Sequence, residues 1–161
     1  MPRLTLDAID RRILEELQAN GRLSNVALAE RVGLSPSPCL RRVKILERSG
    51  VISGYRAILD RRGAGLTLTV FVGLKVGRHH AEEYQAFKDA ISNVPEIIAC
   101  HLVSGDTDFL LEVVVTDVDG YDRFLLGTLL KLPGVTDIRS SIAIRALKPT
   151  GTLPVSHLPS G

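Results

Sequence analysis

The sequence Ser35–Arg48, SPSPCLRRVKILER, determines how the first third of the chain is interpreted. Ser35 can cap a helix with its side-chain oxygen, and the proline that follows suits the first helical position. Within the predicted helix, Cys39, Val43 and Leu46 recur at helical spacing and form an apolar stripe. The other face carries four cations against one Glu. This division is typical of a recognition helix in a DNA major groove, although an ordinary basic surface helix has the same pattern.

Two shorter helices are predicted upstream. Their capping and terminating residues are Asp7 and Asn20-Gly21 for the first helix, and Ser24 and Gly33 for the second. Two short helices, a tight glycine-containing turn and a basic third helix indicate a helix-turn-helix. The segment Val51–Tyr55 then predicts a small wing or a strand that leads out of the motif. Residues 1–55 are therefore expected to form a winged helix-turn-helix DNA-binding domain.

A linker and a second domain are predicted after this motif. The glycine-containing, charged segment 56–65 is expected to be a linker or hinge. Segment Leu66–Val76 alternates apolar residues with others, which is typical of a half-buried strand. The remaining elements are predicted as a helix through Tyr84, Phe87 and Ile91, strands at 97–104 and 109–115, a helix at 121–132, and a strand at 135–147. Residues 149–161 are expected to be an extended or loosely ordered tail.

An internal repeat specifies how these elements are arranged. Phe71 and Phe109 are 38 positions apart, and so are Pro95 and Pro133. Two β-α-β halves in tandem give a ferredoxin-like βαββαβ sandwich, here over residues 66–148, so the predicted fold class is α+β. Such a sheet carries helices on one face only. A second copy of the chain is the simplest cover for the other face, which predicts a homodimer.

Composition restricts the class of protein further. Residues 1–60 hold ten Lys and Arg against seven Asp and Glu, whereas residues 61–161 hold ten against eleven, so the basic excess lies in the first domain. No apolar run approaches the length of a membrane span, and the N-terminus lacks the apolar core of a signal peptide. A cytoplasmic protein with no membrane partner is expected. Cys39 and Cys100 are isolated in apolar patterns, which predicts free buried thiols and neither a disulfide nor a metal site.

One polar cluster interrupts the second domain. Gly105, Asp106, Thr107 and Asp108 lie between two apolar strands, where they could hold the ammonium group of a small ligand or a metal ion. A plain hairpin turn has the same composition, because Gly and Asp favour turns. The sequence contains no catalytic triad order, P-loop or dinucleotide-binding glycine motif, so nothing in it indicates an enzyme.

Three stretches together resemble the Lrp/AsnC family, nearest its leucine-responsive branch. They are SPSPCLRRV at 35–43, GVISGY at 50–55, and CHLVSGDTDFLL at 100–111, which LPGV follows at 132–135. The resemblance extends from about Leu6 to about Lys148. It implies a transcription regulator with an N-terminal DNA-binding domain and a C-terminal domain that senses an amino acid. It also implies homodimers that assemble into octamers, and no cofactor other than the effector.

The resemblance also implies which residues bind the effector. By motif position these are Gly105, Asp106, Thr107 and Asp108, with Val118 and Ser141 at positions that adjoin the ligand in similar proteins. Thr107 and Ser141 depart from the pattern, because each occupies a position where an aromatic residue can occur in the family.

The face of the predicted third helix supplies the expected DNA contacts. They are Arg41, Arg42 and Lys44, together with the hydroxyl groups of Ser35 and Ser37. Two other classes of function remain open at this point. One is a metabolic enzyme that uses the ferredoxin-like domain, and the other is a winged helix that binds protein.

Overall fold

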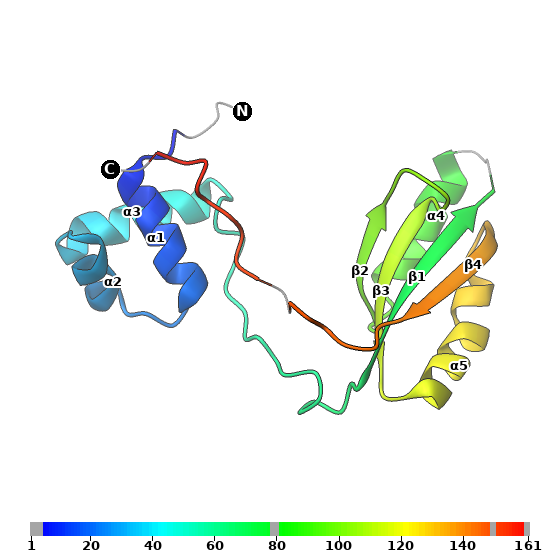
Figure 1. Ribbon diagram of the computed structural model, residues 1–161. Coiled ribbons are helices and arrows are strands. Elements are labelled where there is room, and N and C mark those ends of the chain that lie inside the picture. The colour runs from blue at the N-terminus through cyan, green and yellow to red at the C-terminus, as the bar shows by residue number, and fades with distance from the viewer. Residues whose placement is uncertain (1–4, 78–80, 149–150, 160–161) are drawn as a thin grey trace. The chain divides into compact units, whose positions relative to one another are not determined.

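A computed structural model describes residues 5–77, 81–148 and 151–159 (Figure 1). The chain forms two compact units, and each has its own hydrophobic core. Unit 1 consists of Met1–Ile58 together with Lys148–Gly161, and unit 2 consists of Leu59–Leu147. Within the described ranges, no helix is both long enough and apolar enough to cross a membrane.

Unit 1 contains three helices, α1 (Ala8–Ala19), α2 (Asn25–Val32) and α3 (Pro36–Arg48). Asp7 caps α1 by accepting hydrogen bonds from the N–H groups of Ile9 and Asp10, and the Asp10 carboxylate accepts one from the Asp7 N–H. Ser24 caps α2, and Gly33 ends it in the left-handed region at φ 74°. The capping residues predicted for the first two helices are confirmed.

The start of α3 differs from the prediction in one respect. Ser35 occupies the N-cap position, but its side chain makes no capping hydrogen bond. A capping side chain normally accepts from the N–H of the second or third helical residue. The third residue here is Pro38, which has no N–H, and the N–H of the second residue, Ser37, makes no bond to the Ser35 side chain. The Ser35 hydroxyl, which lies at the exposed start of α3, is therefore left without the capping bond.

The core of unit 1 is built from all three helices. Its buried members are Ile13, Leu14, Leu28, Ala29, Val32, Cys39 and Leu46. Burial raises the pKa of the Cys39 thiol, which keeps it protonated at neutral pH. The expected wing is not formed as a strand, because Val51–Tyr55 is irregular and has no partner strand among the described residues. Without a partner strand, the backbone of this segment makes no inter-strand hydrogen bonds.

Residues 151–159 lie against α1. The Leu153 N–H donates to Gln18 Oε1 at 2.7 Å, and Gln18 Nε2 donates to the Leu153 carbonyl at 3.2 Å. Arg11 Nη1 donates to the Leu158 carbonyl at 3.3 Å, and the Leu158 side chain packs against the core of unit 1. The tail was expected to be extended or loosely ordered, and for residues 151–159 these contacts argue against the second description; residues 149–150 and 160–161 lie outside the described residues. Residues 151–159 form no helix or strand, but they are held in place by side chains distant in the sequence.

Unit 2 is a four-stranded antiparallel sheet in the order β2-β3-β1-β4. Its elements are β1 (Leu68–Val76), α4 (Ala81–Ser92), β2 (Ile97–Leu102), β3 (Phe109–Val115), α5 (Val118–Gly127), the short 3-10 helix η1 (Leu129–Lys131) and β4 (Val135–Ile142). This is the βαββαβ topology that the repeat predicted. The last strand is shorter than expected: its register with β1 ends at Ile142, and the last bond between the two segments is from the Ala143 N–H to the Thr69 carbonyl at 2.9 Å.

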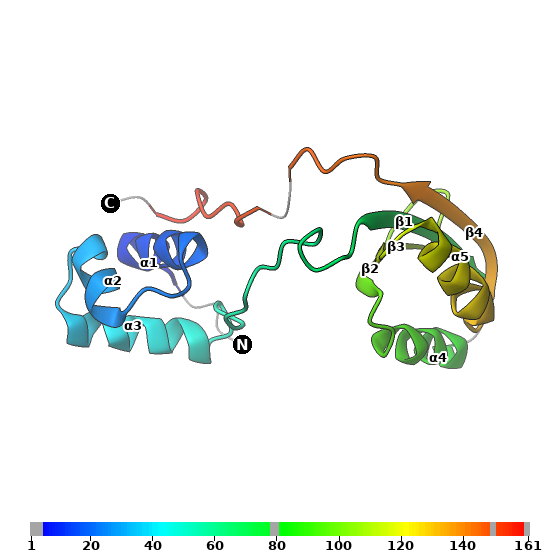
Figure 2. The same ribbon diagram turned by 90° about the horizontal axis from the view of Figure 1, so that it is seen from below.

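The two helices of unit 2 cover the same face of the sheet (Figure 2). Val70, Val72 and Leu74 of β1 point into this core and are fully buried. The opposite face is open within one chain. There Phe71 is 41% exposed, and Leu110 on the neighbouring strand is 36% exposed. Arg61 reaches the same face, where Nη2 lies 2.9 Å from the Glu112 carboxylate.

Candidate nucleic-acid interface and ligand loop

The exposed face of α3 presents cations and hydroxyl groups together. Ser37, Arg41 and Lys44 are all exposed on it, and Ser35 is exposed at its start. An open hollow of about 320 Å³ follows this face and is lined by Ser37, Leu40, Arg41, Lys44, Ile45 and Arg48. Hydroxyl groups and a helix N-terminus suit phosphates, and arginine suits phosphates or guanine edges. The face therefore has the chemistry of a DNA-binding surface.

Arg42 lies elsewhere. Its Nη1 is 2.8 Å from Asp7 Oδ2 and 2.8 Å from Asp10 Oδ1. The two carboxylates raise the pKa of the guanidinium, with Asp10 contributing most, and the Arg42 side chain is only 28% exposed. The sequence assigned Arg42 to the DNA contacts. In the structure this residue instead joins α3 to the start of α1, because a tertiary ion pair uses its guanidinium.

Asp7 has two roles at this junction. The pKa of its carboxyl is lowered, mainly because it accepts the backbone hydrogen bond from Asp10, and also because Arg42 lies beside it. The charged form of Asp7 therefore stabilises the folded unit. This contribution is present above the ordinary pKa of an aspartate and is lost as pH falls through the lowered value.

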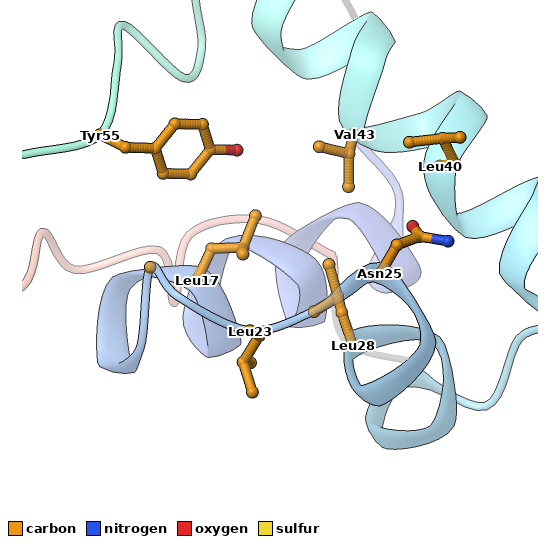
Figure 3. A pocket seen from close by; sticks show the side chains of 8 residues that line it. Leu17, Leu23, Asn25, Leu28, Leu40, Val43 and Tyr55 are labelled. Carbon is orange, nitrogen blue, oxygen red and sulfur yellow. The ribbon is translucent and has the colours of Figure 1, made fainter.

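A second hollow of about 140 Å³ lies inside the helical unit (Figure 3). Its lining residues are Leu17, Gly21, Leu23, Asn25, Leu28, Leu40, Val43 and Tyr55. None of these side chains is charged, so the hollow offers nothing to pair with the ammonium or carboxylate of an amino acid. Asn25 Nδ2 donates to the Pro36 carbonyl at 2.8 Å, which ties α2 to the start of α3. We interpret this hollow as packing space within the motif.

In unit 2, the loop Gly105–Asp108 is anchored on β1 by its last residue. The Val76 N–H donates to Asp108 Oδ2 at 2.9 Å, and the Asp108 N–H donates to the Leu74 carbonyl at 2.9 Å. Both the carboxylate and the N–H of Asp108 are therefore hydrogen-bonded to the backbone of β1. Gly105 has φ 132°, a conformation that L-residues with a side chain rarely adopt. The cluster is therefore a shaped loop rather than a tight two-residue turn.

Asp106 is left available by this arrangement. Its side chain is 92% exposed, and the nearest cation is Arg139 Nη1 on β4, at 3.9 Å from Asp106 Oδ2. An exposed pair at this distance contributes little to stability, so a ligand can replace it, while Arg139 Nε stays bonded to Asp137 Oδ2 at 3.2 Å. A carboxylate beside a guanidinium is complementary to the two charges of an amino acid. Sequence reasoning missed Arg139, because its partner lies 33 residues away in the chain.

The other expected ligand residues do not all lie near this loop. Ser141 is exposed on β4, two residues from Arg139 and on the same face of the sheet. Val118 is 63% exposed at the start of α5, which follows the far end of β3. The loop precedes Phe109, and Val118 comes after Val115, so the length of β3 separates them within one chain.

Gly73 of β1 packs against the loop at Thr107. A methyl group built on Gly73 would lie 2.7 Å from Cγ2 of Thr107, so the Thr107 side chain fills the space that the glycine leaves. Gly73 is buried on the open face of β1, between Phe71 and Lys75, and a glycine inside a strand is the signal that could have indicated a close approach.

We expect Gly73→Ala to destabilise unit 2 by about 1–3 kcal/mol, the usual cost of overpacking. Urea unfolding would measure this loss. Thr107→Ala removes the opposing methyl group, so the double variant Gly73→Ala/Thr107→Ala should recover most of the stability. If the second change restores nothing, the Gly73 effect comes from the strand itself and not from the loop above it.

Comparisons with known proteins agree with both units. Residues 6–53 match the winged helix-turn-helix DNA-binding family, and residues 69–153 match the Lrp/AsnC ligand binding domain. A helix-turn-helix with a cationic third helix, joined to a sheet domain with a shaped polar loop, defines a ligand-responsive DNA-binding regulator. The chain belongs to the Lrp/AsnC family, as the sequence resemblance indicated. It is a transcription regulator and not an enzyme.

The relatives cover nearly the whole chain. The leucine-responsive regulatory proteins of Klebsiella pneumoniae and Escherichia coli (strain K12) are each 46% identical over 154 residues, which is 96% of this chain and 94% of theirs. The transcriptional regulator NMB0573 of Neisseria meningitidis, solved in complex with L-Met, is 41% identical with a TM-score of 0.91 over 95% of this chain and 99% of that one. An AsnC family regulator of Agrobacterium tumefaciens is 37% identical, with a TM-score of 0.90 over 94% and 99%.

Proposed function

We propose that this regulator binds double-stranded DNA through α3, and that Arg41 and Lys44, together with the hydroxyl groups of Ser35 and Ser37, make the contacts. The observation that carries this proposal is that Ser37, Arg41 and Lys44 are exposed on one face of a packed helix, with Ser35 exposed at its start. The Ser35 hydroxyl group is exposed at the start of α3, and its O–H can donate to a phosphate. We leave Arg42 out of this proposal, because Asp7 and Asp10 pair with its guanidinium through Nη1.

Salt dependence of DNA binding tests this assignment. Each phosphate contact that is removed should reduce the slope of log K against log salt by about 0.9. If both cations contact phosphates, Arg41→Ala/Lys44→Ala should lower this slope by about two and weaken binding to every sequence. A duplex selected by the protein from random DNA serves as probe, and fluorescence anisotropy measures affinity. Wild-type affinity and slope in the double variant would refute the assignment.

The double variant needs a control that changes charge elsewhere. Arg123 is an exposed cation on α5 in unit 2. Arg123→Ala therefore removes a positive charge without touching α3, and it should keep the wild-type slope. Equal losses in Arg123→Ala would mean that total charge, and not the α3 face, determines affinity.

We further propose that the effector is an amino acid bound at the loop Gly105–Asp108. Asp106 would accept hydrogen bonds from the ammonium group, and Arg139 would pair with the carboxylate. Ser141 lies on the same face and would contribute to the side-chain pocket. The bound L-Met of the Neisseria relative makes methionine the first ligand to test. Because β3 separates Val118 from the loop within one chain, Val118 would join the site only from a second copy.

We propose a homodimer as the smallest unit, assembling into octamers. The exposed Phe71 and Leu110 on the open face of the sheet support a second copy there. Sedimentation velocity at micromolar concentration, with and without the amino acid, checks both assemblies. A DNA partner and free cysteines support a cytoplasmic location.

A further inference from the structure

The DNA-facing side of α3 includes two aliphatic side chains among its cations. Leu40 is 42% exposed and Ile45 is 44% exposed. Both line the open hollow that also contains the cations Arg41, Lys44 and Arg48. A single exposed aliphatic residue is ordinary on a protein surface. Two exposed aliphatic residues that share a hollow with three cations form a surface that is partly apolar and partly cationic. A partner that fits this surface must offer both apolar and anionic groups.

The helical positions of these residues show how the surface is divided. Arg41, Lys44 and Arg48 recur at i, i+3 and i+7, so they form one row along α3. Leu40 lies on one border of this row and Ile45 on the other, and neither belongs to the buried stripe of the helix. The surface is therefore a cationic row with an aliphatic side chain at each edge.

We propose that Leu40 and Ile45 contact thymine methyl groups in the major groove and thereby select A·T base pairs. This inference rests on the proposed DNA binding by α3. The C5-methyl group of thymine is the apolar feature on the base edges of this groove, and each base pair also brings phosphates for the cations. A site with cytosine at the same position offers no methyl group to the aliphatic side chain. The protein is therefore expected to bind the site with thymine more tightly.

Replacing thymine with deoxyuridine tests this directly, because the change removes only the methyl group. The probe is a duplex selected by the protein from random DNA, in which each thymine is replaced in turn. We expect wild-type affinity to fall about fourfold at one or two positions in each half-site, which corresponds to about 0.8 kcal/mol for one buried methyl group. Fluorescence anisotropy at constant salt measures the change.

Variants identify which side chain reads which methyl group. Leu40→Ala should abolish the uridine effect at one position and Ile45→Ala at another, and each should leave the other position unchanged. Leu40 also lines the small hollow in the helical core, so Leu40→Ala could disturb the fold as well as the DNA contact. Leu40→Met keeps the side-chain volume and should therefore retain the uridine effect. Leu126→Ala is the matched control, because Leu126 is an aliphatic residue 55% exposed on α5 in unit 2. It should retain both uridine effects.

The outcomes separate this inference from the proposed function. If wild-type protein binds the selected duplex but no uridine replacement weakens binding, the thymine contacts are refuted and DNA binding stands. If the uridine effects persist unchanged in both Leu40→Ala and Ile45→Ala, other side chains read the methyl groups, and the inference is again overturned. If the protein selects no duplex at all, the proposed DNA binding itself fails.

Discussion

Asp106→Ala should weaken amino-acid binding about 10- to 100-fold, because it removes hydrogen bonds to a charged ammonium group worth about 1.5–3 kcal/mol. The same change should leave stability within about 0.5 kcal/mol, because the Asp106 side chain is 92% exposed. The ligand is the amino acid, among all twenty, that raises the melting temperature most. Calorimetry measures its affinity, and urea unfolding measures the stability of the variant.

Two further carboxylates make this result interpretable. Asp108→Ala should lower stability as well as binding, because Asp108 accepts the Val76 N–H and anchors the loop. Asp89→Ala removes an exposed carboxylate on α4 and should leave both properties unchanged. If Asp106→Ala binds the ligand as tightly as wild type does, the site lies outside this loop. If Asp106→Ala unfolds as readily as Asp108→Ala, the effect is structural.

Arg42→Ala should destabilise unit 1 by about 2 kcal/mol. Breaking a fully buried ion pair costs about 3–5 kcal/mol, and the partial exposure of Arg42 and Asp7 reduces that figure. The loss remains substantial because Asp10, only 13% exposed, is left without its cation. Amide hydrogen exchange in α1 and α3 measures the opening of this unit separately from that of unit 2.

Arg41→Ala is the matched control for this prediction. It removes the same side chain from the neighbouring, exposed position, so it should leave hydrogen exchange unchanged while weakening DNA binding. Arg42→Lys should recover only part of the loss, because the lysine side chain is one bond shorter than the distance from Cα to Nη1, the atom that contacts both carboxylates. Unchanged exchange in Arg42→Ala would show that the ion pairs with Asp7 and Asp10 are not structural.

Acid provides a second readout of the same junction. The lowered pKa of Asp7 means that wild-type unit 1 loses stability as pH falls below about 4. Arg42→Ala should reduce this dependence without abolishing it, because the backbone hydrogen bond from Asp10 makes the largest contribution and remains.

Features encoded by nearby residues were predicted from the sequence. Asp7, Ser24 and Gly33 set the ends of the first two helices through contacts within a few residues, so a local pattern reveals them. The alternation along β1 is also a local pattern, and it predicted a strand. The 38-residue repeat of such local patterns predicted the rest of the sheet and its two helices. The loop at Gly105–Asp108 was predicted because its polar residues lie between two apolar strands.

Features that depend on distant partners were not predicted. The charge of Arg42 suggested DNA contact, and only the folded chain shows that Asp7 and Asp10 lie 2.8 Å from it. The two aspartates of the loop Gly105–Asp108 are equivalent in sequence. They differ in the structure because Asp108 meets the β1 backbone and Asp106 does not. The Ser35 cap was a local prediction that failed: Pro38 removes one of the two possible donors, and the N–H of Ser37 makes no such bond either.

The contacts of residues 151–159 with α1 have a consequence for biosynthesis. Unit 1 is discontinuous, because all of unit 2 lies between its two parts in the sequence. A ribosome therefore completes the whole sheet domain before the residues that bond Gln18 and Arg11 leave the exit tunnel. The three helices can form early, but they acquire this set of contacts only after the whole sheet domain has been synthesised. A nascent chain thus carries its ligand-sensing domain before its DNA-binding unit is complete.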